Sequence, residues 1–304
     1  MMRVRLAPDE VESVTVVQDM LAEALGDRYS LERELGRGGM ATVYLARDLR
    51  EGRPVAIKAM HRGLVTALGT ERFHREMGIA ASLSHPLIVP LYDSGDAGGV
   101  LYYVMPYVEG DSLYQRLERE KRLPLDDALR ITHDVADALG YAHGQGVLHR
   151  DVKPENILLT GGRAVVADFG LARAIGAADY RKLTETGVVL GTIYYMSPEQ
   201  LGGRRDLDQR ADIYSLGCIL YEMLTGEPPY TGTLEQVVSR IVRAPIPSAQ
   251  RLSPTVPAAV DQAIGRAIAK SAAERFGTMK EFAAALPNSP TPDGATKESN
   301  DDDR

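Results

Sequence analysis

The spacing of apolar residues changes along the chain and divides it into two parts. In Tyr29–Met105, short runs of β-branched and aromatic residues alternate with turns, and one helical segment, Glu71–Leu83, interrupts them. After Gly110 the apolar positions recur at helical spacing, most clearly in Leu129–Ala142 and Ile213–Met223. The pattern predicts a small β-sheet lobe with one helix, followed by a larger and mainly helical lobe. Together these make an α+β fold.

The two ends of the chain differ from the part between them. Val11–Leu25 has apolar residues at helical spacing and predicts an amphipathic helix within an N-terminal extension, residues 1–27. Such a helix can pack on its own domain, which the pattern favours, or bind a partner or a second copy. Residues 287–304 have no large apolar side chain to bury and predict a disordered acidic tail. We therefore expect the two lobes over residues 28–105 and 106–286.

Composition and charge exclude some classes of protein. The chain has 304 residues, 44% apolar and 25% charged, as in ordinary globular proteins. Of the net charge of −7, residues 1–27 contribute six acids and two bases (−4) and residues 287–304 five acids and two bases (−3), so the part between is neutral. It offers no basic stripe for nucleic acid. No apolar run reaches the roughly 18 to 20 residues that cross a bilayer, so we expect no transmembrane segment and a cytoplasmic location.

A glycine-rich segment lies between two predicted strands. Gly36, Gly38 and Gly39 lack side chains where backbone N–H groups could approach phosphate oxygens. Ala41 occupies the third position of a G-x-G-x-x-G pattern, and a glycine-rich hairpin is more often only a turn. The segment alone leaves a phosphate-binding loop and a simple turn both open.

A lysine and a glutamate that follow can face the same interior. On the predicted strand Val55–Met60, Lys58 points away from the side of Val55 and Ile57. On the next helix Glu76 lies within the apolar stripe, where a carboxylate needs a partner. The pattern predicts a buried Lys58–Glu76 pair, in which Glu76 holds Lys58 in place for the α- and β-phosphates of ATP. A surface lysine and a misread helix register are the alternative.

One short polar segment carries the groups that phosphoryl transfer needs. The octapeptide His149–Asn156 contains a carboxylate (Asp151), an ammonium group (Lys153) and the side-chain amide of Asn156. Asp168-Phe169-Gly170 follows, after a predicted strand. Transfer from ATP requires metal ligands, a positive charge on the transferring group and an acceptor for the proton of the hydroxyl. The set fits that chemistry and little else.

In this order the motifs resemble those of the eukaryotic-type (Hanks-type) protein kinase superfamily, and the chain is most similar to its bacterial serine/threonine kinases. The resemblance spans Tyr29–Leu286. It implies a bilobal fold and transfer of the γ-phosphate of ATP to Ser or Thr hydroxyls of protein substrates. The cofactors it implies are ATP and Mg²⁺, with Mn²⁺ as an alternative cation.

The resemblance also assigns roles to single residues. It implies that Asp151 orients the substrate hydroxyl and takes its proton, that Lys153 neutralises charge on the γ-phosphate, and that Asn156 and Asp168 bind the cation. Met105 resembles the gatekeeper beside adenine. The implied nucleotide contacts are Gly36, Arg37, Gly38, Gly39, Val43, Ala56, Lys58, Met105 and the hinge residues Pro106 and Val108.

Further matches concern the framework of the site. Ser197-Pro198-Glu199 resembles the end of the activation segment, with Glu199 expected to pair with Arg275. Asp212 resembles the aspartate that braces the catalytic-loop backbone, although a helix N-cap is an equal alternative. Phe169 and Gly170, like His149, resemble structural residues.

The resemblance also suggests the acceptor and a form of control. Thr192, together with Lys153, resembles the serine/threonine branch. Arg150 resembles the arginine that pairs with a phosphorylated activation loop, and Thr184 and Thr186 are the candidates for autophosphorylation, which could involve self-association. Unmodified polar loop residues are the alternative.

Two rival functions remain open at this point. One is a pseudokinase that acts by binding, which the presence of all the catalytic groups disfavours. The other is a kinase of small molecules, against which Lys153 and the Glu199/Arg275 pair argue. The two departures from the family pattern, Ala41 in the loop and Pro106 at the hinge, remove no required group, because proline keeps the carbonyl that the first hinge position contributes.

Overall fold

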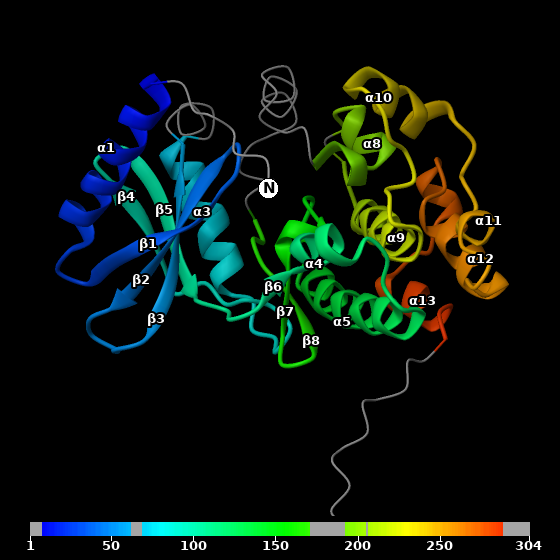
Figure 1. The fold of residues 1–304 in the computed structure, drawn as a ribbon, viewed down its shortest axis with the longest axis horizontal. Coiled ribbons are helices and arrows are strands. Elements are labelled where there is room, and N and C mark those ends of the chain that lie inside the picture. The colour runs from blue at the N-terminus through cyan, green and yellow to red at the C-terminus, as the bar shows by residue number, and fades with distance from the viewer. Residues whose placement is uncertain (1–7, 62–68, 171–191, 205, 288–304) are drawn as a thin grey trace, which may run out of the picture.

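A five-stranded antiparallel sheet forms the first lobe of the computed structural model, which describes residues 8–61, 69–170, 192–204 and 206–287 (Figure 1). The strand order is β1-β2-β3-β5-β4. The strands are β1 (Tyr29–Arg37), β2 (Ala41–Asp48), β3 (Pro54–Met60), β4 (Asp93–Ala97) and β5 (Val100–Pro106). The predicted sheet lobe is therefore confirmed, while β4 is an addition that the sequence pattern did not indicate.

One helix packs on each face of this sheet. Helix α1 (Pro8–Leu25) buries Leu21 and Leu25 in a cluster with Ile57 and the other outward side chains of β3. Helix α3 (Thr70–Ala81) covers the opposite face, where Phe73 joins a second cluster. The alternation of strand side chains explains this division, because successive residues of a strand point to opposite faces. The N-terminal helix thus packs on its own domain.

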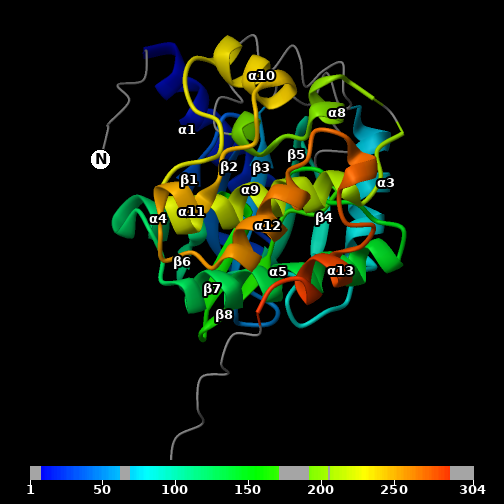
Figure 2. The same ribbon diagram turned by 90° about the vertical axis from the view of Figure 1, so that its right-hand side faces the viewer.

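The second lobe is mainly helical and contains the largest apolar cluster of the described residues. Figure 2 shows α9 (Arg210–Thr225) in the middle of this lobe, with α12 beside it. A side chain at Gly217 of α9 would lie 2.8 Å from Ala267 and Ile268, so glycine allows the two helices to approach closely. The other helices are α4 (Leu113–Glu120), α5 (Leu125–Gly144), α8 (Pro198–Leu201), α10 (Leu234–Arg243), α11 (Ala249–Leu252), α12 (Ala258–Ala267) and α13 (Met279–Ala284).

A small sheet packs against α4 and α5 of the second lobe and adjoins the segments that contain the predicted catalytic residues. Its strands are β6 (Asp111–Ser112), β7 (Ile157–Thr160) and β8 (Arg163–Val166), in the order β6-β7-β8. The one-turn helix η1 (Pro154–Asn156) leads directly into β7. Two further short 3₁₀ helices are η2 (Thr192–Tyr195) and η3 (Ala272–Glu274). This sheet places the end of the His149–Asn156 octapeptide next to the segment that starts at Asp168.

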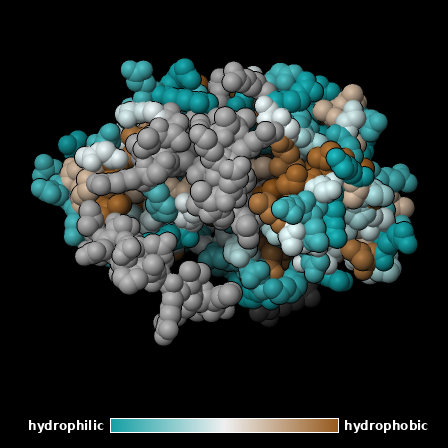
Figure 3. All heavy atoms as spheres, turned by 90° about the horizontal axis from the view of Figure 1, so that it is seen from above, coloured by the Kyte–Doolittle hydropathy of each residue, from teal (hydrophilic) through white to brown (hydrophobic). Residues whose placement is uncertain are grey.

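On the face seen from above, apolar side chains are distributed unevenly. Seen from above, hydrophilic side chains dominate the outer ends, and apolar side chains gather on the helical half beside the middle (Figure 3). Within the described part of the chain, no helix combines the length and hydropathy needed to cross a bilayer.

The contact between α1 and the sheet can be tested by truncating one buried side chain. Leu21 is fully buried, so Leu21→Ala should lower the free energy of unfolding by about 2 to 5 kcal/mol. Glu23→Ala, at an exposed position of the same helix, should change it by less than about 0.5 kcal/mol. Denaturant unfolding measures both variants. Equal stabilities would show that α1 does not pack on the sheet in solution.

Candidate active site

The glycine-rich loop is a tight turn between β1 and β2. The Gly38 N–H donates to the Ala41 carbonyl at 2.9 Å, and the strands pair Gly36 with Val43 and Arg37 with Thr42. A Cβ added at Gly36 would meet nothing within 4 Å, and one at Gly38 would meet only the Ala41 carbonyl, at 3.9 Å. Packing within the protein does not require glycine at these two positions. Close approach of a ligand is therefore a physical reason for them.

His61, which the sequence analysis missed, holds this loop from the end of β3. Its Nδ1 lies 3.1 Å from the Gly39 carbonyl and its Nε2 lies 3.1 Å from the Thr42 hydroxyl. Because a carbonyl only accepts, Nδ1–H donates to Gly39 and Nε2 accepts from Thr42. Burial lowers the pKa of His61, which favours this neutral form.

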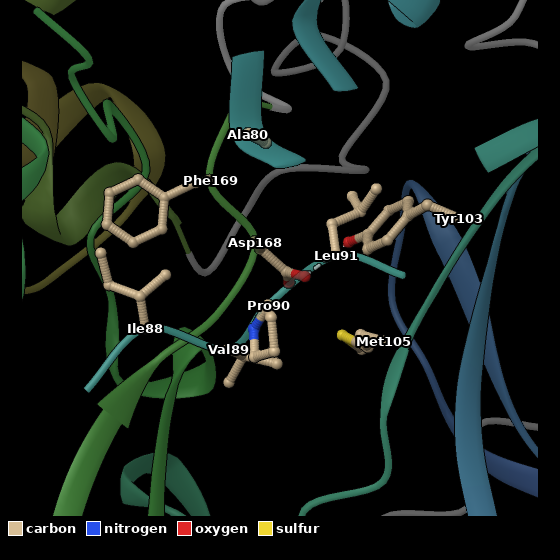
Figure 4. Close-up of a pocket in the computed structure, with 9 residues that line it drawn as sticks. All are labelled: Ala80, Ile88, Val89, Pro90, Leu91, Tyr103, Met105, Asp168 and Phe169. Carbon is tan, nitrogen blue, oxygen red and sulfur yellow. Dashed lines mark hydrogen bonds between the residues drawn. The ribbon is translucent and has the colours of Figure 1, made fainter. Parts of the chain in front are cut away.

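Lys58 and Tyr103 meet the carboxylate of Asp168 between the two lobes. Lys58 Nζ lies 2.5 Å from Asp168 Oδ2, and the Tyr103 hydroxyl donates to Asp168 Oδ1 at 2.5 Å. Figure 4 shows the Asp168 carboxylate pointing toward Tyr103, with Met105 on the same side. Burial alone would raise the pKa of Asp168, but the Lys58 ammonium and the hydrogen bonds hold it below its usual value. The carboxylate is therefore ionised at neutral pH.

The predicted ion pair between Lys58 and Glu76 is not found among the described contacts. Glu76 does lie on the buried face of α3, with 1% of its side chain exposed, and its carboxylate is 3.4 Å from Arg75. Lys58 instead contacts Asp168, which reaches it from the other lobe. Asp168 has a positive φ of 68°, a backbone conformation that is uncommon outside glycine. The sequence showed both carboxylates but not which one lies nearer to the lysine.

Gly170 connects the Asp168 segment to α3. Its φ is 88°, and a Cβ there would lie 3.2 Å from the Glu76 carbonyl oxygen. Glycine is required on both counts, because other residues are strained at this φ and the added atom would crowd the helix. The segment can therefore lie directly against α3.

The catalytic-loop residues form one compact group. Lys153 Nζ lies 2.8 Å from Asp151 Oδ2, and the Asn156 amide donates to the Asp151 carbonyl at 2.9 Å. The same amide lies 3.4 Å from the Asp151 carboxylate. Burial alone would lower the pKa of Lys153, but the Asp151 carboxylate outweighs it and raises that pKa. Lys153 is therefore a permanent cation beside Asp151.

Asn156 and Asp168 lie at the same end of the β7–β8 hairpin. Ile157 pairs with Val166, and the Ala167 N–H donates to the Asn156 carbonyl at 2.9 Å. This pairing places Asp168 one residue from the position opposite Asn156. An amide oxygen and a carboxylate at such a point are hard oxygen donors of the kind that Mg²⁺ accepts together with phosphates.

Asp212 braces the backbone of the catalytic loop. Its carboxylate accepts hydrogen bonds from the N–H groups of His149 at 2.9 Å and Arg150 at 2.8 Å, and contacts His143 Nε2 at 2.7 Å. Burial alone would raise the pKa of Asp212, but His143 and these hydrogen bonds lower it. The alternative role as a helix N-cap is not observed, because Asp212 lies within α9 and Gln209 occupies the N-cap.

Three further contacts connect the segments around the site. Phe169 packs edge-on against the His149 ring, with centroids 4.6 Å apart. Arg275, whose side chain is fully buried, donates to both carboxylate oxygens of Glu199, at 2.6 and 2.8 Å. Gln200 next to Glu199 donates to the Arg150 carbonyl at 2.8 Å. The structure thus brings the expected partners Glu199 and Arg275 together.

The hinge residues occupy the end of β5 and the segment after it. Met105 pairs with Ala56 and Pro106 with Val55, so Pro106 still belongs to the strand, one residue beyond the expected boundary of the lobe. Val108 follows and is partly buried. Thr184 and Thr186 lie outside the described residues. Thr192 begins η2, but its side chain also lies outside the described part.

An acidic group lies near the catalytic loop. The Tyr195 hydroxyl donates to Glu222 Oε2 at 2.6 Å. The pKa of Glu222 is raised to about 7: burial is the largest cause, the Tyr195 hydrogen bond opposes it, and the negative charges of Glu155 and Glu118 add to the rise. Burial likewise raises the pKa of Glu155. Glu222 therefore changes its charge near neutral pH.

This ionisation makes a prediction for stability. The folded protein holds the Glu222 proton up to pH about 7, whereas an ordinary glutamate loses it near 4.5, so the contribution of this proton to stability is lost progressively between pH 4.5 and pH about 7. Glu222→Gln keeps an acceptor for Tyr195 without the charge. It should therefore gain stability over the wild type between pH 5 and pH 8, by about 1 to 3 kcal/mol. Thermal unfolding across this pH range measures the gain. Glu235→Gln, at an exposed position, is the control, and parallel pH profiles for all three proteins would contradict the prediction.

Comparison with known proteins gives a consistent result. Residues 29–283 match the family model described as "Protein kinase domain". The chain is 43% identical over 270 residues to serine/threonine-protein kinase PknB of Mycobacterium leprae, covering 86% of this chain and 43% of that protein. It is 38% identical over 268 residues to serine/threonine-protein kinase PrkC of Bacillus subtilis, covering 87% of this chain and 41% of that protein.

The chain spans about two fifths of the length of these curated relatives. The match nevertheless includes both lobes and every segment of the site described above. The chain therefore belongs to the protein kinase family, in its Hanks-type bacterial serine/threonine branch.

Proposed function

We propose that the chain transfers the γ-phosphate of ATP to serine or threonine hydroxyls of protein substrates. The observation that carries the proposal is the compact group of Asp151, Lys153 and Asn156 beside Asp168, within reach of Lys58 and the glycine-rich loop. The names of the relatives support the same activity. A small-molecule kinase and a pseudokinase could both have this nucleotide site. The test is therefore whether phosphate is transferred, and to which acceptor.

The residues divide the reaction among them. The glycine-rich loop and Lys58 hold the phosphates of ATP, and the backbone of Pro106 and Val108 meets the adenine beside Met105. Asp151 accepts the proton of the substrate hydroxyl as the oxygen attacks the γ-phosphorus, and the bond to the β-phosphate oxygen breaks. Lys153 balances the charge that develops on the transferred group. Asp151 thus acts on the hydroxyl proton, and Lys153 acts on the transferred phosphate.

Asn156 and Asp168 would hold the divalent cation. Their oxygen donors fit Mg²⁺, and Mn²⁺ accepts the same ligands, so both cations should support the reaction. Bound there, the cation would supply positive charge that offsets the negative charge of the phosphates. Burial alone would raise the pKa of Asp168, but the Lys58 ammonium and the hydrogen bonds from Lys58 and Tyr103 keep it below its usual value, so this ligand is ionised.

We further propose control by autophosphorylation and a cytoplasmic site of action. The backbone of Arg150 is fixed by Asp212 and Gln200, which supports a role for this arginine in receiving a phosphate from the activation loop. Phosphorylation of Thr184 or Thr186 by a second copy would require transient self-association. A cytoplasmic location agrees with the use of ATP and with Cys218, which is buried as a free thiol.

Replacing the proposed proton acceptor tests the activity. Asp151→Asn should lower the turnover number at least about 100-fold, because the proton of the hydroxyl loses its acceptor, while ATP binding remains within a few-fold. The measurement is phosphate transfer from radiolabelled ATP to a generic protein acceptor, beside a panel of small metabolites. Asp19→Asn, which removes an exposed carboxylate of α1, should leave the rate unchanged.

Three other outcomes would contradict the proposal. Full activity of Asp151→Asn would remove the assignment of the proton acceptor. Transfer only to a small metabolite would favour the small-molecule kinase. ATP binding without any transfer by the wild type would favour the pseudokinase.

Intact-mass spectrometry tests the proposed control by autophosphorylation. After incubation with ATP and Mg²⁺, the intact protein should gain one or two phosphates, each about −1.5 to −2 charges at pH 7. The Thr184→Ala/Thr186→Ala double variant should lose that gain. Phosphate on other peptides only, with none on this one, would refute the proposed sites. A rate of phosphorylation that rises with protein concentration would support transfer between two copies.

A further inference from the structure

Tyr103 occupies an unusual place for a polar side chain. It lies on β5 two residues before Met105 and therefore on the same face of the sheet. Its side chain is 3% exposed and belongs to the apolar cluster that contains Phe73, Met77 and Leu101. A buried phenol of this kind requires a hydrogen-bond partner.

The partner of Tyr103 is the carboxylate that we assign to the cation. Its hydroxyl donates to Asp168 Oδ1 at 2.5 Å, while Lys58 contacts the other oxygen, Oδ2, at 2.5 Å. Two donors on different oxygens fix both the position and the rotation of a carboxylate. Because the acceptor is charged, the bond from Tyr103 is stronger than one between neutral groups.

Among the side chains that line the cavity beside Asp168, Tyr103 donates a hydrogen bond to its carboxylate. A small cavity lies beside the carboxylate, with a volume of about 20 Å³, and apolar side chains such as Ile88, Val89 and Leu91 form most of its lining (Figure 4). These side chains cannot donate a hydrogen bond to Asp168. When Lys58 engages a phosphate of ATP, the phenol of Tyr103 can keep its bond to the carboxylate, since it is neutral and does not interact with the phosphate as a charge.

We propose that Tyr103 is a positioning residue, which holds the Asp168 carboxylate in the orientation that binds the divalent cation. The inference rests on the proposed function, because it takes Asp168 as a cation ligand. The effect of Tyr103 acts through Asp168, as for other groups that orient metal ligands by a hydrogen bond.

A purely structural role for Tyr103 makes a different prediction. Tyrosine in this cluster fills space next to Met77 and Leu101, and phenylalanine would fill nearly the same space. Under that alternative, loss of the hydroxyl changes only stability. Under our proposal, loss of the hydroxyl lowers the affinity for the cation and leaves the affinity for the nucleotide without the cation unchanged.

The experiment uses the whole chain and compares Tyr103→Phe with Tyr102→Phe. Tyr102 is the neighbouring residue on β5, but it belongs to the cluster under α1 on the opposite face of the sheet. Calorimetric titration of ADP at a series of Mg²⁺ concentrations gives two quantities. The first is the affinity for ADP without Mg²⁺, and the second is the Mg²⁺ concentration at which half of the Mg²⁺-dependent increase in ADP affinity is reached. Tyr103→Phe should raise the second quantity about 10-fold or more and leave the first within about 2-fold. Tyr102→Phe should change neither.

Equal Mg²⁺ requirements for Tyr103→Phe, Tyr102→Phe and the wild type would overturn the inference. A lower Mg²⁺ requirement for Tyr103→Phe would overturn it as well, because Tyr103 would then compete with the cation for Asp168. If Tyr103→Phe does not yield folded protein, Tyr103→Met gives the same test, since the flexible methionine side chain also fills the cluster without a hydroxyl.

Asp168→Asn separates this inference from the proposed function. Loss of the Mg²⁺ enhancement in Asp168→Asn together with a normal Tyr103→Phe would refute the role of Tyr103 alone. A full Mg²⁺ enhancement in Asp168→Asn would refute Asp168 as the cation ligand, and the inference would fail with it.

Discussion

The catalytic loop depends on one buried carboxylate, that of Asp212. Only 1% of this residue is exposed, so its charge must be compensated inside the protein. The compensation comes from the N–H groups of His149 and Arg150 and from the ring of His143. Asp212 lies on α9, in the core of the helical lobe, so its hydrogen bonds attach the loop to that core. The positions of Asp151 and Asn156 follow from this anchor.

The segment that starts at Asp168 joins this rigid part to the sheet lobe. Each of its three residues has a different contact. Asp168 meets Lys58 and Tyr103, Phe169 packs on His149, and Gly170 lies against the Glu76 carbonyl of α3. A change in any of these contacts would move the carboxylate relative to the catalytic loop. This segment of three residues therefore contacts both lobes.

The predictable part of the fold comes from segments with a strong local signal. β3 and β5 are rich in β-branched and aromatic residues, and the apolar spacing of α5 and α9 is plainly helical. β4 escaped prediction because its sequence, Asp-Ser-Gly-Asp-Ala, consists of residues that are rare in strands. It forms a strand because β5 offers it a free edge for pairing. Tertiary context thus outweighed local preference at this position.

The sequence by itself determined the set of chemical groups, since Asp151, Lys153 and Asn156 lie within one octapeptide and need only a local turn to meet. The tertiary structure decided which partners the buried charges have. Lys58 contacts Asp168, 110 residues away, and Tyr103 contacts the same carboxylate across 65 residues. Helical spacing placed Glu76 correctly in the interior but could not rank it against Asp168. The physical reason is that spacing along the chain fixes the face on which a side chain lies, whereas the packing of the two lobes sets the distance between charges.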